Sequence, residues 1–242
     1  MQYKERLIAF LDILGFKRII EKTESDIVEF KKLIEVLYAI KNSFNQINST
    51  DENPTDIHIS MFSDSIIISA SLTCKADIFV SLLLKTNVWL LERGYFVRGG
   101  VDYGNIYHKN EIVFGPAFVK AYELEKLADY PRIILSENAR KKLHHEKNGN
   151  TTSVSMSHIY FKKDCDGLYY VDYFLKDDTD EYKKFIDDLK KNVDENILNN
   201  RQNQSILKKM MWIKNKICLS EQEKNKIGTV DDFLESFDCN AR

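Results

Sequence analysis

Residues 6–16 read RLIAFLDILGF, and this stretch decides how the chain begins to fold. Apolar residues surround the single carboxylate of Asp12, and Gly15 follows three positions later. A dense apolar run of this kind is typical of a buried strand, and the glycine gives the backbone freedom to turn. We therefore predict a buried strand that ends near Asp12, where a carboxylate is costly unless it is paired or holds a metal ion.

A second carboxylate lies in a similar setting. Residues 57–69 read IHISMFSDSIIIS, which predicts two strands joined by a tight turn at Ser63-Asp64. Each carboxylate alone has a plain structural explanation, because Asp12 would cap a helix and Asp64 would be a turn residue. The two together, beside a glycine-rich strand at residues 95–104, favour a site that holds metal.

The other segments complete an α+β domain that we place at residues 1–150. Apolar residues at helical spacing predict helices at residues 26–44, 76–93 and 118–128. Residues 106–114 are expected to pair back on the preceding strand, and residues 132–135 to form a short strand. This order predicts an antiparallel-rich, ferredoxin-like sheet with helices on one face.

Residues 151–242 are expected to form a small α/β extension docked on the first domain. Segments 159–161 and 168–174 are strand-like on either side of a turn at residues 164–167, and charged helices are predicted at residues 181–199 and 204–217. The turn lacks the downstream glutamate of a calcium loop, so we interpret it as structural.

Composition excludes several classes of function. The net charge of −2 gives no basic field, so we expect no nucleic-acid partner. The basic run at residues 140–147 is interpreted as a solvated helix end in preference to a phosphate patch. The four scattered cysteines make no metal knuckle, and the apolar stretch around Asp12 is too short for a membrane span. We predict a cytoplasmic protein with no membrane partner.

Four motifs resemble those of the class III nucleotide cyclases, over residues 5–145. Residues 10–16 resemble the first metal motif of that family, Phe-x-Asp-Ile-x-Gly-Phe, and Ser63-Asp64 resembles its Gly-Asp hairpin tip. Residues 98–104 are similar to its Arg-x-Gly-x-x-x-Gly strand, and residues 114–121 to the glycine that opens its catalytic helix. The motifs stand in the order of the family.

The resemblance implies a metal-dependent reaction on a nucleoside triphosphate. Two divalent cations, Mn²⁺ or Mg²⁺, would be held by Asp12, Asp64 and the backbone carbonyl of Ile13. The family builds its site between two subunits, so a homodimer with composite active sites is also implied.

The sequence departs from the purine-specific members of this family. Ser60 stands where they carry a base-reading lysine, and Ile112 where they carry a base-reading aspartate. Val119 and Glu123 replace their transition-state asparagine and arginine. We predict a base pocket formed by Phe10, Ser60 and Ile112. The candidates for the missing cation are Arg98, Lys120 and Arg132.

A site that keeps its metal carboxylates and lacks the purine readers resembles the pyrimidine cyclases of the bacterial Pycsar antiphage system. That resemblance implies conversion of UTP, ahead of CTP, to the cyclic monophosphate as a second messenger for a separate effector in antiviral defence. The alternative is a degenerate cyclase fold that binds a nucleotide or dimerises without turnover. A metal-dependent phosphohydrolase or polymerase-like enzyme is a third reading.

Overall fold

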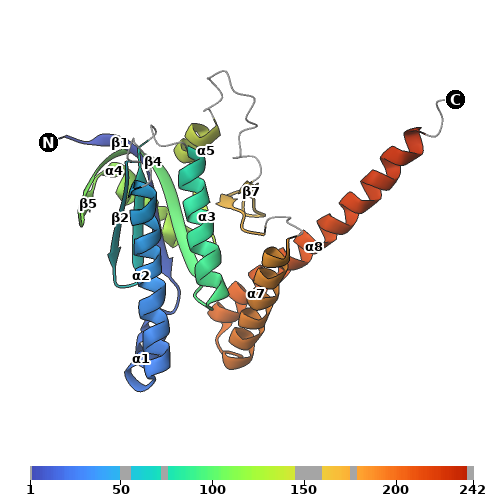
Figure 1. Cartoon of the computed structure of the whole chain (residues 1–242), viewed down its shortest axis with the longest axis horizontal. Helices are drawn as coiled ribbons and strands as arrows, with labels where there is room; N and C mark the ends of the chain where they lie inside the picture. The colour runs from blue at the N-terminus through green and yellow to red at the C-terminus, as the bar shows by residue number, and fades with distance from the viewer. Residues whose placement is uncertain (1, 50–55, 72–75, 145–159, 175–178, 239–242) are drawn as a thin grey trace. The chain divides into compact units, whose positions relative to one another are not determined.

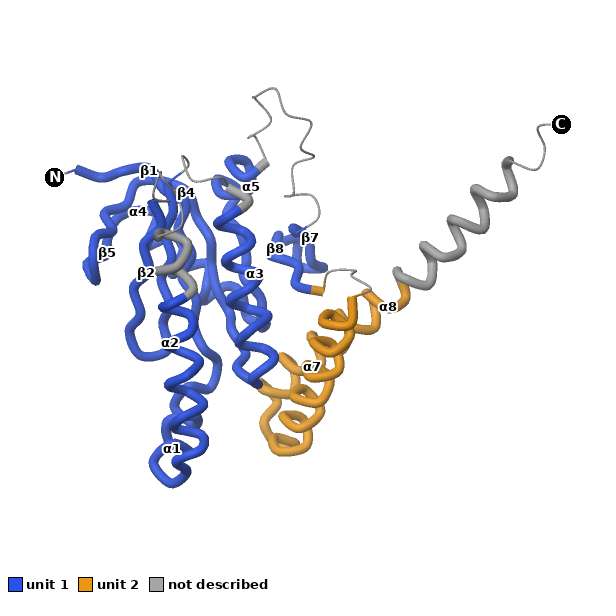
Figure 2. The backbone as a smooth tube through the Cα atoms, viewed as in Figure 1, with its two compact units in different colours: residues 1–173 blue, residues 174–242 orange. Residues whose placement is uncertain are grey.

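The computed structural model describes residues 2–49, 56–71, 76–144, 160–174 and 179–238 (Figure 1). They form two compact units, residues 1–173 and residues 174–242 (Figure 2). The strands are β1 (Lys4–Ile13), β2 (Ile57–Phe62), β3 (Ser65–Ala70), β4 (Val97–Lys109), β5 (Ile112–Phe114), β6 (Ile133–Leu135), β7 (Phe161–Lys163) and β8 (Tyr169–Val171). The helices are α1 (Phe16–Ser25), α2 (Ile27–Ser49), α3 (Ala76–Glu92), α4 (Pro116–Leu127), α5 (Glu137–His144), α7 (Asp180–Asn199) and α8 (Gln204–Asp238).

The strands of the first unit form one eight-stranded sheet in the order β2-β3-β1-β4-β6-β8-β7, with β5 paired to β4. The pairs β2–β3, β3–β1 and β1–β4 are antiparallel. The order β2-β3-β1-β4, with α1 and α2 after β1 and with α3 between β3 and β4, is the ferredoxin-like arrangement. The predicted α+β class and plan are therefore confirmed.

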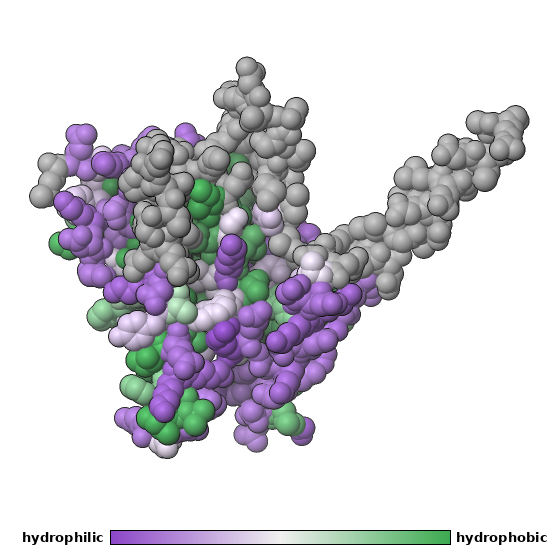
Figure 3. Space-filling view, in the orientation of Figure 1, coloured by the Kyte–Doolittle hydropathy of each residue, from purple (hydrophilic) through white to green (hydrophobic). Residues whose placement is uncertain are grey.

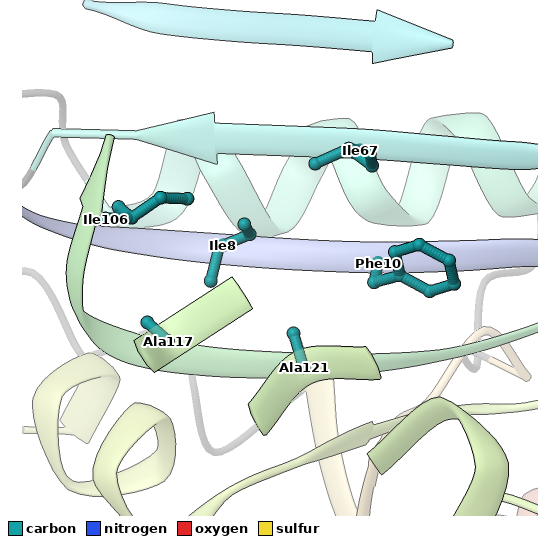
Figure 4. Packing of buried hydrophobic residues seen from close by; sticks show 6 residues of the cluster. All are labelled: Ile8, Phe10, Ile67, Ile106, Ala117 and Ala121. Atoms are coloured by element: carbon teal, nitrogen blue, oxygen red, sulfur yellow. The ribbon is translucent and has the colours of Figure 1, made fainter. Parts of the chain in front are cut away.

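Strand β1 is central because both sets of its alternating side chains are buried. Leu7, Ala9 and Leu11 are fully buried on one face, and Ile8 and Phe10 are buried on the other. The helices α2 and α3 lie over the face of the first set (Figure 1). Ala117 and Ala121 of α4 pack against Ile8 and Phe10 (Figure 4). The expectation of helices on one face thus holds for α2 and α3, whereas α4 covers the opposite face.

Helix α4 approaches the sheet closely at Gly100 of β4, where there is no side chain beneath it. A Cβ at Gly100 would lie 2.2 Å from the carbonyl oxygen of Ala121 and 2.8 Å from the amide nitrogen of Glu125. At Gly104 a Cβ would meet Ala117 Cβ at 3.5 Å, an ordinary contact. The backbone contact at Gly100 fixes which residues of α4 face the sheet.

The hairpin of β7 and β8 belongs to the first unit, which corrects the predicted boundary near residue 150. Strand β8 pairs with β6 and so extends the main sheet. The turn of this hairpin holds Arg132, which is fully buried and forms ion pairs with Asp164 and Asp166. The turn is structural, as predicted, but it anchors a buried arginine that local sequence does not reveal.

The second unit is a pair of helices in the part that the structure describes. The hairpin and the two helices expected over residues 151–242 are all present, with the hairpin in the first unit and the helices in the second. Thr179 caps α7, since its hydroxyl accepts a hydrogen bond from the amide of Tyr182 at 3.3 Å. The ring of Trp212 packs edge-on against Phe174, with ring centroids 6.2 Å apart. Helix α8 runs well beyond residue 217, where the sequence pattern had placed its end.

Apolar side chains are exposed where α1 meets α2, the end of the first unit that appears green in Figure 3. Ile27 and Val28 are 65% and 67% exposed there. Helix α1 buries none of its side chains, and it is a helix that the sequence analysis did not predict. Within the described residues, no helix combines the length and the apolar character that a bilayer crossing requires.

The close approach of α4 predicts unequal effects of alanine at two glycines of β4. Gly100→Ala is expected to cost about 3 kcal/mol in the free energy of unfolding, because its Cβ would displace the backbone of α4. Gly104→Ala is the matched control and is expected to change stability by less than about 1 kcal/mol. Urea denaturation measures both, and equal losses would contradict this account of the α4 contact.

Candidate functional site

Asp12 and Asp64 meet at the end of β1. Asp12 is in register with Ser65 of β3 on one side and with Arg98 of β4 on the other. The amide of Ile13 donates to the carbonyl oxygen of Asp64 at 3.0 Å, which ties the β2–β3 turn to β1. Ser63 has a φ of 55°, the left-handed conformation that favours glycine at a turn. The structure therefore brings together the carboxylates that the sequence predicted as a pair.

The electrostatics of Asp12 show how costly this placement is. The pKa of Asp12 is raised to about 6. Burial is the largest cause, and the negative charges of Glu125 and Asp64 are the next two. A side-chain hydrogen bond between Asp12 and Asp64 acts in the same direction, whereas the charge of Arg98 opposes it. Two carboxylates in such proximity repel each other unless a proton or a cation lies between them.

Arg98 lies beside this pair. Its Nη2 is 3.6 Å from Oδ2 of Asp12, and its Nε donates to the carboxylate of Glu125. The side chain of Glu125 is 4% exposed and that of Arg98 26% exposed. The sequence analysis did not predict a role for Glu125, because its sequence context does not distinguish it from the other charged residues of an amphipathic helix. The contact of α4 with Gly100 is what turns Glu125 towards β4.

A divalent cation fits these carboxylates. Oxygen ligands suit Mg²⁺ and Mn²⁺, and a cation between Asp12 and Asp64 would relieve the repulsion that raises the pKa of Asp12. In the described part of the chain, His, Cys, Asp and Glu side chains form no cluster of three or more with metal-binding geometry. Further ligands would come from backbone carbonyls such as that of Ile13, from water and from phosphate oxygens.

The other predicted cations lie elsewhere. The guanidinium of Arg132 is fully buried, donates to Ala128 O at 3.0 Å and pairs with two aspartates. Its role is structural, which corrects its proposed role in catalysis. Lys120 is half-exposed on α4, 3.3 Å from Glu123. Burial raises the pKa of Asp102, and the charge of Lys120 partly opposes that rise. Of the three candidates, Arg98 is the one that contacts Asp12.

The structure places the three predicted base-pocket residues in different settings. Phe10 is 7% exposed and packs edge-on against Phe118 and Tyr122 of α4, so it belongs to the core. Ser60 is also buried, and its hydroxyl donates to the carbonyl oxygen of Asn110 at 3.0 Å. Ile112, on β5, is 61% exposed.

Ser60 is part of a buried polar network that the sequence did not reveal. His108 lies 2.9 Å from the hydroxyls of both Ser60 and Ser69, and Arg6 donates to Ser69 and to Asp56. Burial, together with the charges of His58 and Arg6, lowers the pKa of His108 to about 4, so this imidazole is neutral at pH 7. The network fastens the long β4 strand to β2 and β3.

The chain was compared with known proteins. No protein-family model matches it, and no curated protein matches it. It is similar to the structure of an adenylyl cyclase, CyaB, from P. aeruginosa, with 16% identity, 59% of this chain and 82% of that chain covered, and a TM-score of 0.44. It is similar to a dimeric guanylyl cyclase domain of the RhoGC fusion protein from Blastocladiella emersonii, with 12% identity, coverages of 71% and 97%, and a TM-score of 0.49. A third similarity is to an adenylate/guanylate cyclase/hydrolase from Silicibacter pomeroyi, with 16% identity, coverages of 71% and 96%, and a TM-score of 0.45. Similarity at this level assigns no activity to the chain.

The raised pKa of Asp12 predicts a pH-dependent gain in stability when its charge is removed. The folded state binds this proton more tightly than the unfolded state, whose carboxyl has a pKa near 3.8, so ionised Asp12 destabilises the fold above about pH 6 and not below pH 3.8. Asp12→Asn is expected to raise the free energy of unfolding at pH 8 in EDTA by up to about 3 kcal/mol. Near pH 3.5 the gain should vanish.

Urea denaturation at the two pH values measures this gain. Added Mn²⁺ is expected to stabilise the wild type and to leave Asp12→Asn unchanged. An Asp12→Asn variant less stable than the wild type at pH 8 without metal would contradict the electrostatic account.

Proposed function

We propose that this protein is a metal-dependent nucleotidyl cyclase, which converts a nucleoside triphosphate to its 3′,5′-cyclic monophosphate and pyrophosphate. The observation that carries the proposal is the meeting of Asp12 and Asp64 at the end of β1, beside Arg98. The motifs that resemble class III cyclases supply these residues, and the ferredoxin-like strand order places them side by side.

In the proposed reaction, the ribose 3′-oxygen attacks the α-phosphorus of the same nucleotide. The new P–O bond forms as the bond to pyrophosphate breaks, and the hydroxyl proton passes to solvent. Asp12, Asp64 and the Ile13 carbonyl would hold two Mn²⁺ or Mg²⁺ ions, which when bound would acidify the hydroxyl and offset charge on the phosphates. Because the attack is intramolecular, positioning lowers much of the barrier.

Arg98 is the residue that we assign to the phosphate charge. Its guanidinium is partly exposed and lies between Asp12 and the buried Glu125. The ion pair with Glu125 restricts the rotamers of Arg98, so less conformational entropy is lost when phosphate binds. Glu125 thus positions Arg98, and its negative charge favours a bound cation near Asp12.

The proposal includes a second copy of the chain. Val119 is 52% exposed and the side chain of Glu123 58% exposed, on the face of α4 that points away from the sheet. In the family that the motifs resemble, residues at these positions act in a site shared by two subunits. The half-exposed Phe114 and the exposed Ile112 on β5 add apolar area to a surface of this kind.

We further propose a pyrimidine substrate, UTP ahead of CTP, and a cytoplasmic role in antiviral signalling through a separate effector. The support is that Ser60 and Ile112 offer neither the lysine nor the aspartate with which purine cyclases read the base. Ser60 is also covered by the β4–β5 turn, so we no longer assign it a direct contact with the base.

One observation favours a second candidate, a nucleotide-binding or dimerisation module without turnover. Each of the cations first considered for phosphate is engaged by a carboxylate, Arg98 by Glu125, Lys120 by Glu123 and Arg132 by Asp164. In this reading the two carboxylates hold a metal–nucleotide complex and no product forms.

Loss of either carboxylate is expected to abolish turnover. Asp12→Ala and Asp64→Ala should each lower kcat at least about 1000-fold, because removal of a metal ligand removes several kcal/mol of charge stabilisation. Asp180→Ala, which removes a fully exposed aspartate of α7, is the matched control and should keep wild-type activity. The assay incubates purified protein with each ribonucleoside triphosphate and Mn²⁺ and detects products by mass spectrometry. Nucleotide binding without any cyclic product would support the second candidate.

The base preference is tested by competition among the four triphosphates. We expect kcat/KM for UTP to exceed that for CTP, and both to exceed ATP and GTP by at least about tenfold, as for a site without partners for the purine edge. Ile112→Asp, a substitution at an exposed position, should favour ATP if this side chain faces the base. ATP or GTP turned over as efficiently as UTP would refute the pyrimidine assignment.

A further inference from the structure

A cavity lies on the first unit, between residues of β1, β4 and α5. It has a volume of about 590 Å³ and is lined by Glu5, Tyr103, Asn105, Asn138, Lys141 and Lys142, together with Gly104. Helix α5 is held in place by its cap, because the Ser136 hydroxyl accepts from the Ala139 amide at 3.0 Å and donates to the buried Asp102. The two lysines of the cavity therefore stand on an anchored helix.

The charge of this cavity favours an anion. Lys141 and Lys142 contribute two positive charges, against one negative charge from Glu5. The nearby Glu137 accepts two hydrogen bonds from Arg140, at 2.7 and 2.8 Å, whereas Lys141 is 3.6 Å from it in an exposed pair. Exposed pairs of this kind contribute little, so the net charge of the lining stays positive.

The remaining walls offer hydrogen bonds and an aromatic face. The ammonium of Lys142 lies 4.9 Å from the ring centre of Tyr103, and the Tyr103 hydroxyl donates to Glu5 at 2.9 Å. The amides of Asn105 and Asn138 can both donate and accept. The volume is in the range of small-molecule sites and exceeds what a single phosphate would fill.

This cavity is separate from the carboxylate pair. Glu5 and Asp12 are seven residues apart on β1, which corresponds to about 23 Å along an extended strand. Tyr103 and Arg98 are five residues apart on β4, which corresponds to about 16 Å.

We propose that the cavity lined by Lys141, Lys142 and Tyr103 binds a phosphorylated small molecule, such as a sugar phosphate or a nucleotide, at a second site. The lysines bind the phosphate group, and the two asparagines bind hydroxyls of the remainder.

Calorimetric titration of the full chain with ribose 5-phosphate tests the proposal. The titration is made in EDTA, which removes the divalent cations that the Asp12–Asp64 site needs, so its result does not depend on cyclase activity. Lys141→Gln and Lys142→Gln are each expected to raise Kd about three- to tenfold. Lys183→Gln, which removes an exposed lysine of α7 with a similar intrahelical ion pair, should leave Kd unchanged.

Glu5→Gln provides a test of opposite sign, because removal of the repulsive charge should lower Kd, an effect that misfolding does not mimic. Ribose without its phosphate should not bind. The proposal is overturned if ribose 5-phosphate fails to bind at millimolar concentration, or if the lysine variants bind it as tightly as the wild type does.

Discussion

The register of β1 against its two neighbours is the constraint on which the site depends. Asp12 stands opposite Ser65 on one side and Arg98 on the other, and the Ile13 amide is bonded to the Asp64 carbonyl. A shift of one residue would turn Asp12 into the opposite face of the sheet. The alternating apolar residues of β1, buried on both faces, hold this register against the repulsion between the carboxylates.

Helix α4 adds the second layer of control. Its backbone rests on Gly100, and this contact carries Glu125 to Arg98 while it leaves Val119 and Glu123 on the outer face. The site therefore concentrates three carboxylates around one guanidinium, an arrangement that costs stability in the metal-free protein. A fold that tolerates such a cost at one strand end is consistent with selection for ligand binding there.

The arginine and lysine side chains of the first unit fall into two groups, buried ones and ones that are at least partly exposed. Arg132 is buried with Asp164 and Asp166 and joins the β7–β8 hairpin to the sheet, and Arg6 is buried with Asp56 and Ser69 below His108. These arginines stabilise the unit and are unavailable to a substrate. Arg98 near the start of β4, and Lys141 and Lys142 beside the middle of that strand, are in contrast partly exposed.

The sequence by itself determined the local features. The dense apolar run predicted β1, and the Ser63-Asp64 turn predicted the hairpin of β2 and β3. Apolar residues at helical spacing predicted α2, α3 and α4 close to their observed bounds. It also predicted Asp12 and Asp64 as a pair of candidate metal ligands, because a carboxylate at the end of an apolar strand is costly and therefore unusual. The periodicity of apolar side chains and the residue preferences of turns extend over only a few residues, so both can be recognised in a single sequence.

Only the tertiary structure decided the long-range pairings. Arg98 meets Glu125 across 27 residues and Arg132 meets Asp164 across 32, so the first lies beside Asp12 and the second is a buried anchor. The same holds for Ser60 beneath Asn110 and for β8, which joined the first unit by pairing with β6. Such contacts depend on which helix lies on which strand. The packing of the whole core sets this arrangement, so it cannot be predicted from the sequence of any single segment.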